Sequence, residues 1–173
     1  MIFISGIHGV GKTYFCNMIK EQLGIKVYSA SSLIAEKSKQ VMISDKHVIN
    51  VNQNQMFFEM AINELRMKQE KFVLDGHFCL LNKEGNISRI PLDTFSFLNP
   101  DMIVLLTEKP SVIAKRRVQR DGIVVNQNDV YTFQKEEKKY AEEIARVLSV
   151  QLIISAGSDD LINILEKIGE EIS

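Results

Sequence analysis

This sequence has few cysteines, few prolines and almost no net charge. These scarcities exclude several classes of protein. The two cysteines among 173 residues, Cys16 and Cys79, give neither a disulfide framework nor the ligand spacing of a zinc site, which favours a reduced, cytoplasmic setting. The net charge of −1 offers no basic field to nucleic acid or an anionic membrane. Apolar runs reach only about five residues, as in 102–106, whereas a transmembrane helix needs roughly 20. Residues 1–5 are apolar but lack the basic region and cleavage site of a signal peptide.

What is present predicts one soluble α/β domain. The length suits a single core, and 45% hydrophobic with 25% charged residues is an ordinary globular mixture. Short apolar runs rich in β-branched residues alternate with longer amphipathic stretches, which predicts a parallel sheet with helices on both faces. The strands that we expect are Ile2–Ser5, Ile25–Tyr28, Phe72–Asp75, Met102–Leu106 and Gln151–Ile154. The helices that we expect span about 12–23, 31–40, 50–70, 91–98, 111–120, 127–149 and 159–171. Such sheets bind ligands beyond the carboxyl ends of their strands.

A glycine-rich stretch directly follows the first expected strand. It reads Gly6, Ile7, His8, Gly9, Val10, Gly11, Lys12 and Thr13, and it matches G-x-x-x-x-G-K-[ST] at every fixed position. Glycines let the backbone curl so that successive N–H groups point at phosphate oxygens, and the helix that follows adds its positive end. Lys12 would bring a full charge to the β- and γ-phosphates, and the Thr13 hydroxyl would bind magnesium. His8 is either a spacer in this loop or a catalytic group. The motif predicts a site for ATP with Mg²⁺.

The third expected strand ends in a carboxylate. An Asp at the carboxyl end of a strand can hold a magnesium-bound water beside the phosphate loop, which makes Asp75 a candidate catalytic residue and, with Thr13, a candidate metal ligand. The alternative is a turn residue that precedes Gly76. His77 either faces the same cleft, as an acceptor contact or proton carrier, or is a hydrogen-bonded packing residue.

Arginines gather on the helix expected after the fourth strand. Arg116 and Arg120 are four residues apart and share a helical face, and Arg117 nearly does. Guanidinium groups from a mobile lid, here at about 115–128, stabilise the charge of a phosphoryl group in transfer, and a closed lid keeps water out. The alternative is a solvated helix face. On the functional interpretation all three arginines and Lys12 are catalytic. The expected nucleotide contacts are Gly6, His8, Gly9, Val10, Gly11, Lys12, Thr13, Tyr14 and Arg116.

With these motifs in this order, the chain resembles the adenylate kinase-type P-loop kinases. It is most similar to the archaeal-type adenylate kinases, with the nuclear adenylate kinase-like ATPases next, and the resemblance covers nearly the whole chain. Beyond the loop, it rests on the Asp-x-His of 73–77, Ile90-Pro91, 98–101, Arg116-Arg117, Gln134 and Tyr140-Ala141. The loop is highly specific for nucleotide binding, whereas the other matches persuade by their order and spacing.

The resemblance implies a three-layer P-loop NTPase fold with a five-stranded parallel sheet in the order 2-3-1-4-5, a helical acceptor insert at about 29–70 and a short lid. It also implies phosphoryl transfer from ATP to a nucleoside monophosphate. One segment departs from the family pattern. The family carries an arginine that grips the monophosphate, but residues 44–55 contain none. Lys46 could replace it only as a point charge, without a bidentate contact.

The acceptor is expected between residues 29–32, the polar stretch 50–55 and the segment 77–89. The candidate acceptor-binding residues are Ser29, Ser31, Gln55, His77 and Arg89. The polar residues 52–55 can instead form the first turn of a helix. Three activities remain open: a nucleotide kinase, a kinase of another small metabolite, and an ATP-hydrolysing switch or assembly factor. The expected partners are ATP and a small acceptor, with neither nucleic acid nor a membrane indicated and the oligomeric state undefined.

Overall fold

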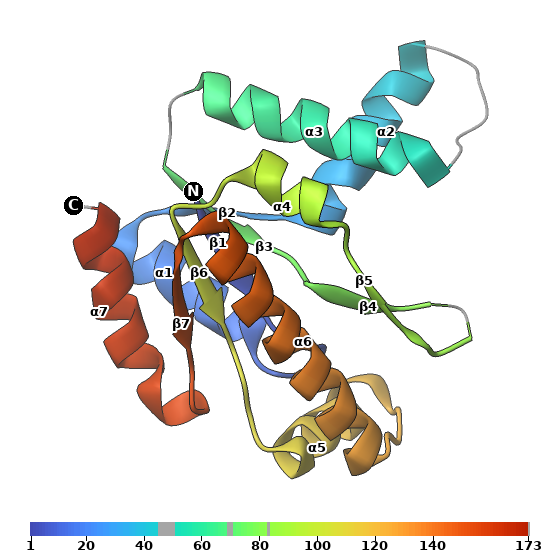
Figure 1. The fold of residues 1–173 in the computed structure, drawn as a ribbon, viewed down its shortest axis with the longest axis vertical. Helices are drawn as coiled ribbons and strands as arrows, with labels where there is room; N and C mark the ends of the chain where they lie inside the picture. The colour runs from blue at the N-terminus through green and yellow to red at the C-terminus, as the bar shows by residue number, and fades with distance from the viewer. Residues whose placement is uncertain (45–50, 69–70, 83, 173) are drawn as a thin grey trace.

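Five parallel strands form the central sheet of the computed structural model, which describes residues 1–44, 51–68, 71–82 and 84–172. The strands lie in the order β2-β3-β1-β6-β7 (Figure 1). Their bounds are β1 Ile2–Ser5, β2 Lys26–Ser29, β3 Phe72–Asp75, β6 Met102–Leu105 and β7 Gln151–Ile154. Counted along the chain, these five follow the succession 2-3-1-4-5. The labels differ because a separate antiparallel hairpin, β4 Cys79–Leu81 with β5 Ile87–Arg89, interrupts the numbering. The α/β class of the expectation is confirmed.

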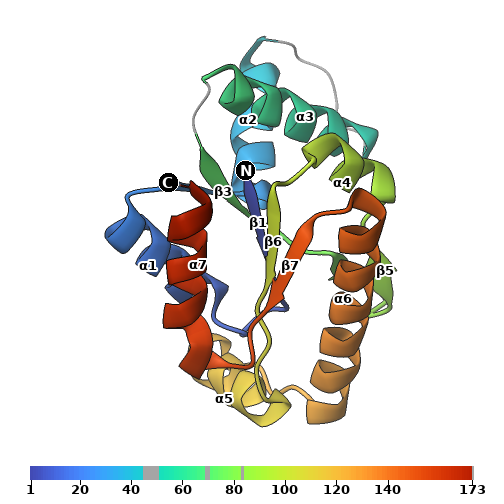
Figure 2. The ribbon, with the colours of Figure 1, turned by 60° about the vertical axis from the view of Figure 1, so that its left-hand side comes forward.

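Helices cover both faces of the sheet and make it the middle layer of three. On one face, α1 packs against α7; on the other, α6 packs against β6, β7 and α4 (Figure 2). The pair α2 and α3 stands beside the β2 edge, and α5 lies near the carboxyl ends of β1 and β6 (Figure 1). The helix bounds are α1 Lys12–Leu23, α2 Ala30–Ser44, α3 Val51–Met67, α4 Leu92–Leu98, α5 Pro110–Asp121, α6 Gln127–Leu148 and α7 Leu161–Ile172, with a 3₁₀ turn η1 at Ser158–Asp160.

The central strands are buried on both faces because apolar side chains fill both spaces between sheet and helices. All four residues of β1 and of β6 are buried, as their continuous apolar runs predict. Beneath α6, Phe3 lies edge-on to Phe78 and Phe95, with ring centroids 5.2 and 5.6 Å apart, and Tyr140 meets the same cluster. Such edge-to-face contacts are the favoured geometry of aromatic pairs. The packing fixes α6 against the sheet.

The ranges expected to form the lid and the acceptor insert contain helices and one loop in the part of the chain that the structure describes. The range 115–128 holds the end of α5, a loop that starts at Gly122 (φ 67°) and the first turn of α6. The range 29–70 holds α2 and α3. None of the helices described by the structure combines the length and apolarity needed to cross a membrane.

Candidate active site

The glycine-rich loop leaves β1 in a conformation that side chains would obstruct. Gly6 and Gly9 have φ values of 147° and 90°. A Cβ on Gly6 would lie 2.7 Å from the Leu106 carbonyl oxygen, and one on Gly9 would lie 2.9 Å from Cγ of Arg117. Both distances are too short for a real carbon contact. The loop then enters α1, whose first N–H groups have no partner within the helix and suit an anion.

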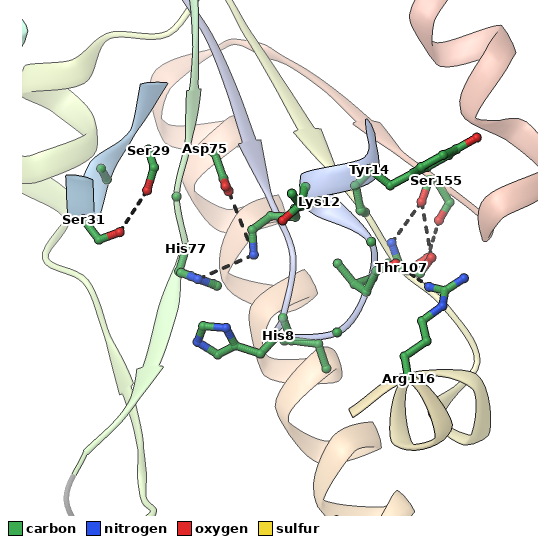
Figure 3. A pocket seen from close by; sticks show the side chains of 18 of the residues that line it. His8, Lys12, Tyr14, Ser29, Ser31, Asp75, His77, Thr107, Arg116 and Ser155 are labelled. Carbon is green, nitrogen blue, oxygen red and sulfur yellow. Dashed lines mark hydrogen bonds and ion pairs between the residues drawn. The ribbon is translucent and has the colours of Figure 1, made fainter. Parts of the chain in front are cut away.

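Lys12 bends back over the loop that it follows. Its Nζ donates to the Gly6 carbonyl at 2.5 Å and lies 3.5 Å from Nε2 of His77 and 4.0 Å from Oδ1 of Asp75 (Figure 3). Burial lowers the pKa of Lys12, and attraction by Asp75 and Glu137 opposes that change. A bound polyphosphate would favour the charged ammonium, because an opposite charge at short range stabilises the ionised form.

Asp75 stands beside the end of β1 because it pairs with Ile4 in the parallel register of β1 and β3. Its Oδ1 atom is buried and accepts no hydrogen bond. Burial raises the pKa of this carboxyl group, and Lys12 opposes the shift. A carboxylate oxygen without a hydrogen bond, next to a phosphate loop, suits the shell of a hard cation that is also held by phosphate oxygens. The exposed hydroxyl of Thr13, in the first turn of α1, can supply a second oxygen. These two residues therefore fit Mg²⁺.

Two imidazoles face each other next to Lys12. The ring centroids of His8 and His77 are 4.7 Å apart. Burial, with Lys12 and His8 adding repulsion, lowers the pKa of His77 to about 3. Burial also lowers the pKa of His8, with further repulsion from Lys12 and Arg117. Both rings are therefore neutral near pH 7. Nε2 of His77 lies 3.5 Å from the Lys12 ammonium group, and Nδ1 is buried without a hydrogen-bond partner.

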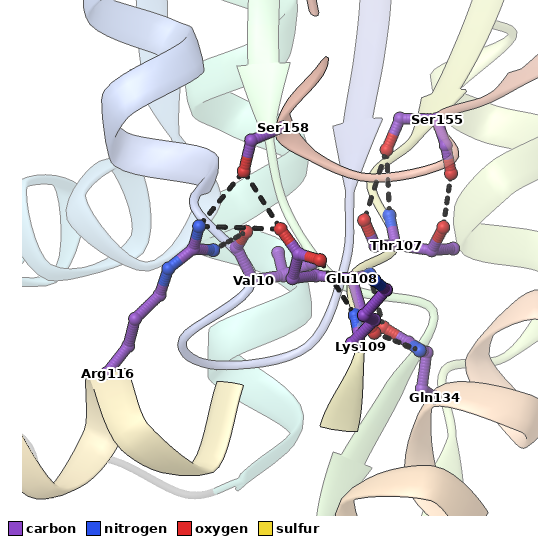
Figure 4. A network of polar contacts seen from close by, with 8 residues as sticks. All are labelled: Val10, Thr107, Glu108, Lys109, Arg116, Gln134, Ser155 and Ser158. Atoms are coloured by element: carbon purple, nitrogen blue, oxygen red, sulfur yellow. Dashed lines mark hydrogen bonds and ion pairs between the residues drawn. The ribbon is translucent and has the colours of Figure 1, made fainter. Parts of the chain in front are cut away.

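Arg116 is held by a polar network on the far side of the loop (Figure 4). Its Nη1 donates to the Val10 carbonyl at 2.8 Å, and its Nη2 donates to Ser158 Oγ at 3.0 Å and lies 3.4 Å from Glu108. Glu108 also accepts from Ser158 at 2.8 Å, and Gln134 of α6 both donates to and accepts from its backbone. Burial raises the pKa of Glu108, but hydrogen bonds from Lys109 and Ser158 outweigh it and the pKa is lowered. The network joins the loop, the start of α5 and the segment after β7.

The other two arginines of α5 have different surroundings. Arg120 is exposed and pairs with Asp121 at 2.7 Å, and it lines the same cavity as Arg116. Arg117 packs its aliphatic part against Gly9, and its Nε is buried without a hydrogen-bond partner. It does not line the cavity. The structure thus brings two of the three predicted arginines to the cavity.

A cavity of about 1190 Å³ extends along the glycine-rich loop, from the end of β2 to the segment after β7. The predicted residues that line it are His8, Gly9, Val10, Gly11, Lys12, Thr13, Tyr14, Ser29, Ser31, Asp75, His77, Arg116 and Arg120. Four others, Gly6, Gln55, Arg89 and Arg117, are not among its lining residues. In Figure 3, Ser29 and Ser31 lie on one side of Lys12, and Thr107, Ser155 and Arg116 lie on the other.

Gln55 and Arg89 have partners elsewhere. Arg89 pairs with Glu136 at 2.5 Å and Glu143 at 2.9 Å, and its guanidinium carbon lies 4.5 Å from the centre of the Tyr140 ring. The carboxylates and the ring of α6 thus hold it outside the cavity. Gln55 is exposed on α3 and donates to Glu59 at 2.9 Å, as the alternative of a polar first turn allows. Lys46 lies outside the described residues.

Sequence reasoning missed Glu137 and the Glu108 network. Glu137 is 1% exposed and sits in a run of charged residues, which reads as a solvated face. One signal was available. Glu137 is four residues after Phe133 and three before Tyr140, so it falls on the apolar stripe of α6. A carboxylate on such a stripe needs hydrogen-bond donors in the core.

With this geometry, comparison with known proteins decides the family. Residues 5–131 match the family model described as "AAA domain". A Methanocaldococcus jannaschii protein named "Putative adenylate kinase" is 30% identical over 186 residues, which span 99% of this chain and 85% of that protein. The chain belongs to the AAA domain family and to the adenylate kinase-type P-loop kinases.

Solved P-loop kinases share the fold of this adenylate kinase-type chain. A shikimate kinase from Acinetobacter baumannii superposes with a TM-score of 0.56 at 16% identity, over 96% of this chain and 89% of that one. A deoxyadenosine kinase from M. mycoides superposes with a TM-score of 0.54 at 13% identity, over 99% of this chain and 98% of that one. At such low identity these likenesses show the fold alone. Membership of the family makes the chain a phosphotransferase of the P-loop kinase kind.

Proposed function

We propose that the protein transfers the γ-phosphoryl group of ATP, bound with Mg²⁺, to a small-molecule acceptor. One observation carries the proposal: a single cavity gathers the loop lysine, a strand-end carboxylate and two arginines, which are Lys12, Asp75, Arg116 and Arg120. Phosphoryl transfer depends mainly on positioning and on stabilising charge spread over the phosphate oxygens. These are the groups that such catalysis requires.

The chain's own residues divide into binding and charge-stabilising roles. The backbone N–H groups of the loop and of the first turn of α1 bind the phosphates, and Lys12 adds a full charge. Arg116, tied to Val10 and Ser158, borders the nucleoside side. Arg120 has only its exposed pair with Asp121 to give up, so it is the arginine able to turn toward the transferring group. Thr13 and Asp75 would hold Mg²⁺, which neutralises charge on the β- and γ-phosphates.

The acceptor side offers hydroxyl groups, a neutral imidazole and an apolar surface. The Oγ atoms of Ser29 and Ser31 lie 2.9 Å apart, and Ile34, Leu80 and Ile90 complete this wall. The name of the relatives suggests a nucleoside monophosphate as acceptor. A second candidate is an acceptor that presents hydroxyl groups and no phosphate. It is favoured because three cations of α2, α3 and β5, which could otherwise bind a phosphate, already have partners within the chain. Lys37 pairs with Glu64, Arg66 donates to two backbone carbonyls, and Arg89 pairs with two glutamates of α6.

The experiment is ATP consumption by the purified chain with a panel of nucleosides, nucleotides and sugars, and mass spectrometry of the products. Matched pairs such as adenosine and AMP separate the two acceptor classes, and Lys12→Ala is the inactive control. We expect at least one acceptor to accelerate ADP formation about tenfold over the acceptor-free rate, because lid closure waits for the acceptor. If no member of the panel is phosphorylated and ATP hydrolysis is already maximal without an acceptor, the kinase function is contradicted and an ATP-hydrolysing switch is favoured.

A further inference from the structure

A buried carboxylate joins the two segments that form the phosphate site. Glu137 of α6 accepts hydrogen bonds from the backbone N–H groups of Phe78 at 3.0 Å and Cys79 at 2.7 Å, and from the Ser5 hydroxyl. Ser5 is the last residue of β1, directly before the glycine-rich loop. Phe78 directly follows His77. One carboxylate therefore binds a side-chain hydroxyl on one segment and two backbone N–H groups on the other, on either side of the place where Lys12, Asp75 and His77 meet.

The three donors explain why a carboxylate can be buried here and why an amide side chain cannot replace it. A buried charge is tolerated where hydrogen bonds satisfy it, and here both oxygens accept from buried groups. A glutamine has one acceptor oxygen and one NH₂ group. Its NH₂ would face at least one of the N–H groups of Phe78 and Cys79, and two donors cannot bond to each other. The arrangement therefore requires a carboxylate and not simply a side chain of that shape.

Helix α6 gives this carboxylate a fixed reference point. The helix has 22 residues, and Phe133, Tyr140 and Ile144 bury its inner face on both sides of Glu137. Tyr140 also donates to the Ile90 carbonyl at 2.7 Å. Glu137 does not line the cavity, so it acts on the site only through the segments that it binds and through its charge.

We propose that Glu137 is a positioning residue that sets the distance between the phosphate loop and the Asp75–His77 segment. The proposal deepens and rests on the proposed kinase function. Lys12 reaches both segments: its Nζ contacts the Gly6 carbonyl on one and lies 3.5 Å from His77 on the other. A displacement of about 1 Å in such a site costs roughly a hundredfold in rate. ATP itself binds mainly to the loop and α1, so its affinity depends far less on the second segment.

The test compares Glu137→Gln with Glu142→Gln, an exposed glutamate of the same helix whose partner is Lys138. In Glu137→Gln we expect kcat to fall at least tenfold while the Kd for ATP-Mg²⁺ changes less than threefold. A second readout needs no turnover: the ring resonance of His77, in a histidine-labelled sample, should shift in Glu137→Gln and stay in place in Glu142→Gln. If the wild type transfers no phosphoryl group, the kinase function fails, and the resonance still decides the role of Glu137.

Two results would overturn the proposal. One is an unchanged kcat with an unmoved His77 resonance. The other is a parallel loss of kcat, ATP affinity and melting temperature, which is the signature of a role in stability alone. Should Glu137→Gln fail to fold, Ser5→Ala removes one donor and keeps the charged acceptor. It should lower kcat about three- to tenfold with little change in ATP affinity, and a Ser5→Ala enzyme with wild-type kcat would also refute the proposal.

Discussion

At the scale of single residues, burial shifts the pKa values of several groups in this site toward their neutral forms. Lys12 and Asp75 are 4.0 Å apart, yet burial lowers the pKa of the first and raises that of the second. Each shift favours the neutral form, and the attraction between the two opposes it. The neutral imidazole of His77 is the extreme case, because Lys12 repels any proton added to it. Binding of an anion next to Lys12 and of a cation next to Asp75 would therefore stabilise the charged forms of these two side chains.

The neutrality of His77 predicts how stability depends on pH. Its pKa is about 3 in the folded chain, against an ordinary value of 6.5, so the unfolded chain binds more protons between these values. Stability is then fully present above pH 6.5 and is lost as pH falls toward 3. Between pH 5.5 and 4.5 the free energy of unfolding should decrease by about 1 kcal/mol more in the wild type than in His77→Asn. Urea unfolding at both pH values measures this. Equal decreases in the two proteins would show that His77 is protonated in the folded state.

At the scale of elements, one helix presents three arginines to three environments. The helical period correctly places Arg116 and Arg120 on one face, and both line the cavity. The same period cannot tell that Arg117 packs on Gly9, because that contact depends on how α5 docks on the loop. Adjacent arginines therefore have separate roles, although they read as one cluster in the sequence.

This separation predicts two different kinetic defects. Arg116→Ala breaks the ties to Val10 and Ser158, so KM for ATP should rise about tenfold with a smaller change in kcat. Arg120→Ala removes the guanidinium that we propose to stabilise the transferring group, and kcat should fall roughly a hundredfold with ATP affinity nearly unchanged. Steady-state kinetics of both variants, with Arg146→Ala on the exposed surface of α6 as control, tests the split. Identical defects in Arg116→Ala and Arg120→Ala would show that the two arginines have the same role, as the sequence interpretation of one cluster implies.

The same scale shows what a sequence can and cannot predict. The strands of the sheet were predicted to within one residue, and the signal was clearest for β1 and β6, which are fully buried and therefore continuous apolar runs. The hairpin β4–β5 was not predicted, since its strands are three residues each and largely exposed. The loop motif and Asp75 were found because their chemistry depends on local spacing. Glu137 and the partners of Arg89 were not found, because their contacts join residues more than 45 positions apart.

At the scale of the molecule, the ligand site and the core are one structure. The carboxylate of Glu137 stands between the aromatic cluster under α6 and the phosphate loop, and the Glu108 network ties the loop to the segment after β7. Cys16 and Cys79 lie within the same region: Cys16 in α1 after the loop, and Cys79 with its N–H bound to Glu137. Both thiols are buried, so their accessibility reports on opening of the whole site.

This coupling predicts that ATP-Mg²⁺ protects both thiols from labelling. Burial raises the pKa of Cys16 and of Cys79 to about 12, so neither is a thiolate near pH 8, and a thiol reagent must wait for the chain to open. A ligand that binds only the native state at about 100 times its Kd adds about 2.7 kcal/mol of stability. Where labelling follows the equilibrium population of the open state, its rate should therefore fall roughly a hundredfold.

Labelling with a chromogenic disulfide, with and without ATP-Mg²⁺, measures the effect. Lys12→Ala should label at the nucleotide-free rate of the wild type in both conditions and show no protection by the nucleotide. Rapid labelling of the wild type in the presence of saturating ATP-Mg²⁺ would show that the thiols become exposed by local motions that do not involve the phosphate loop.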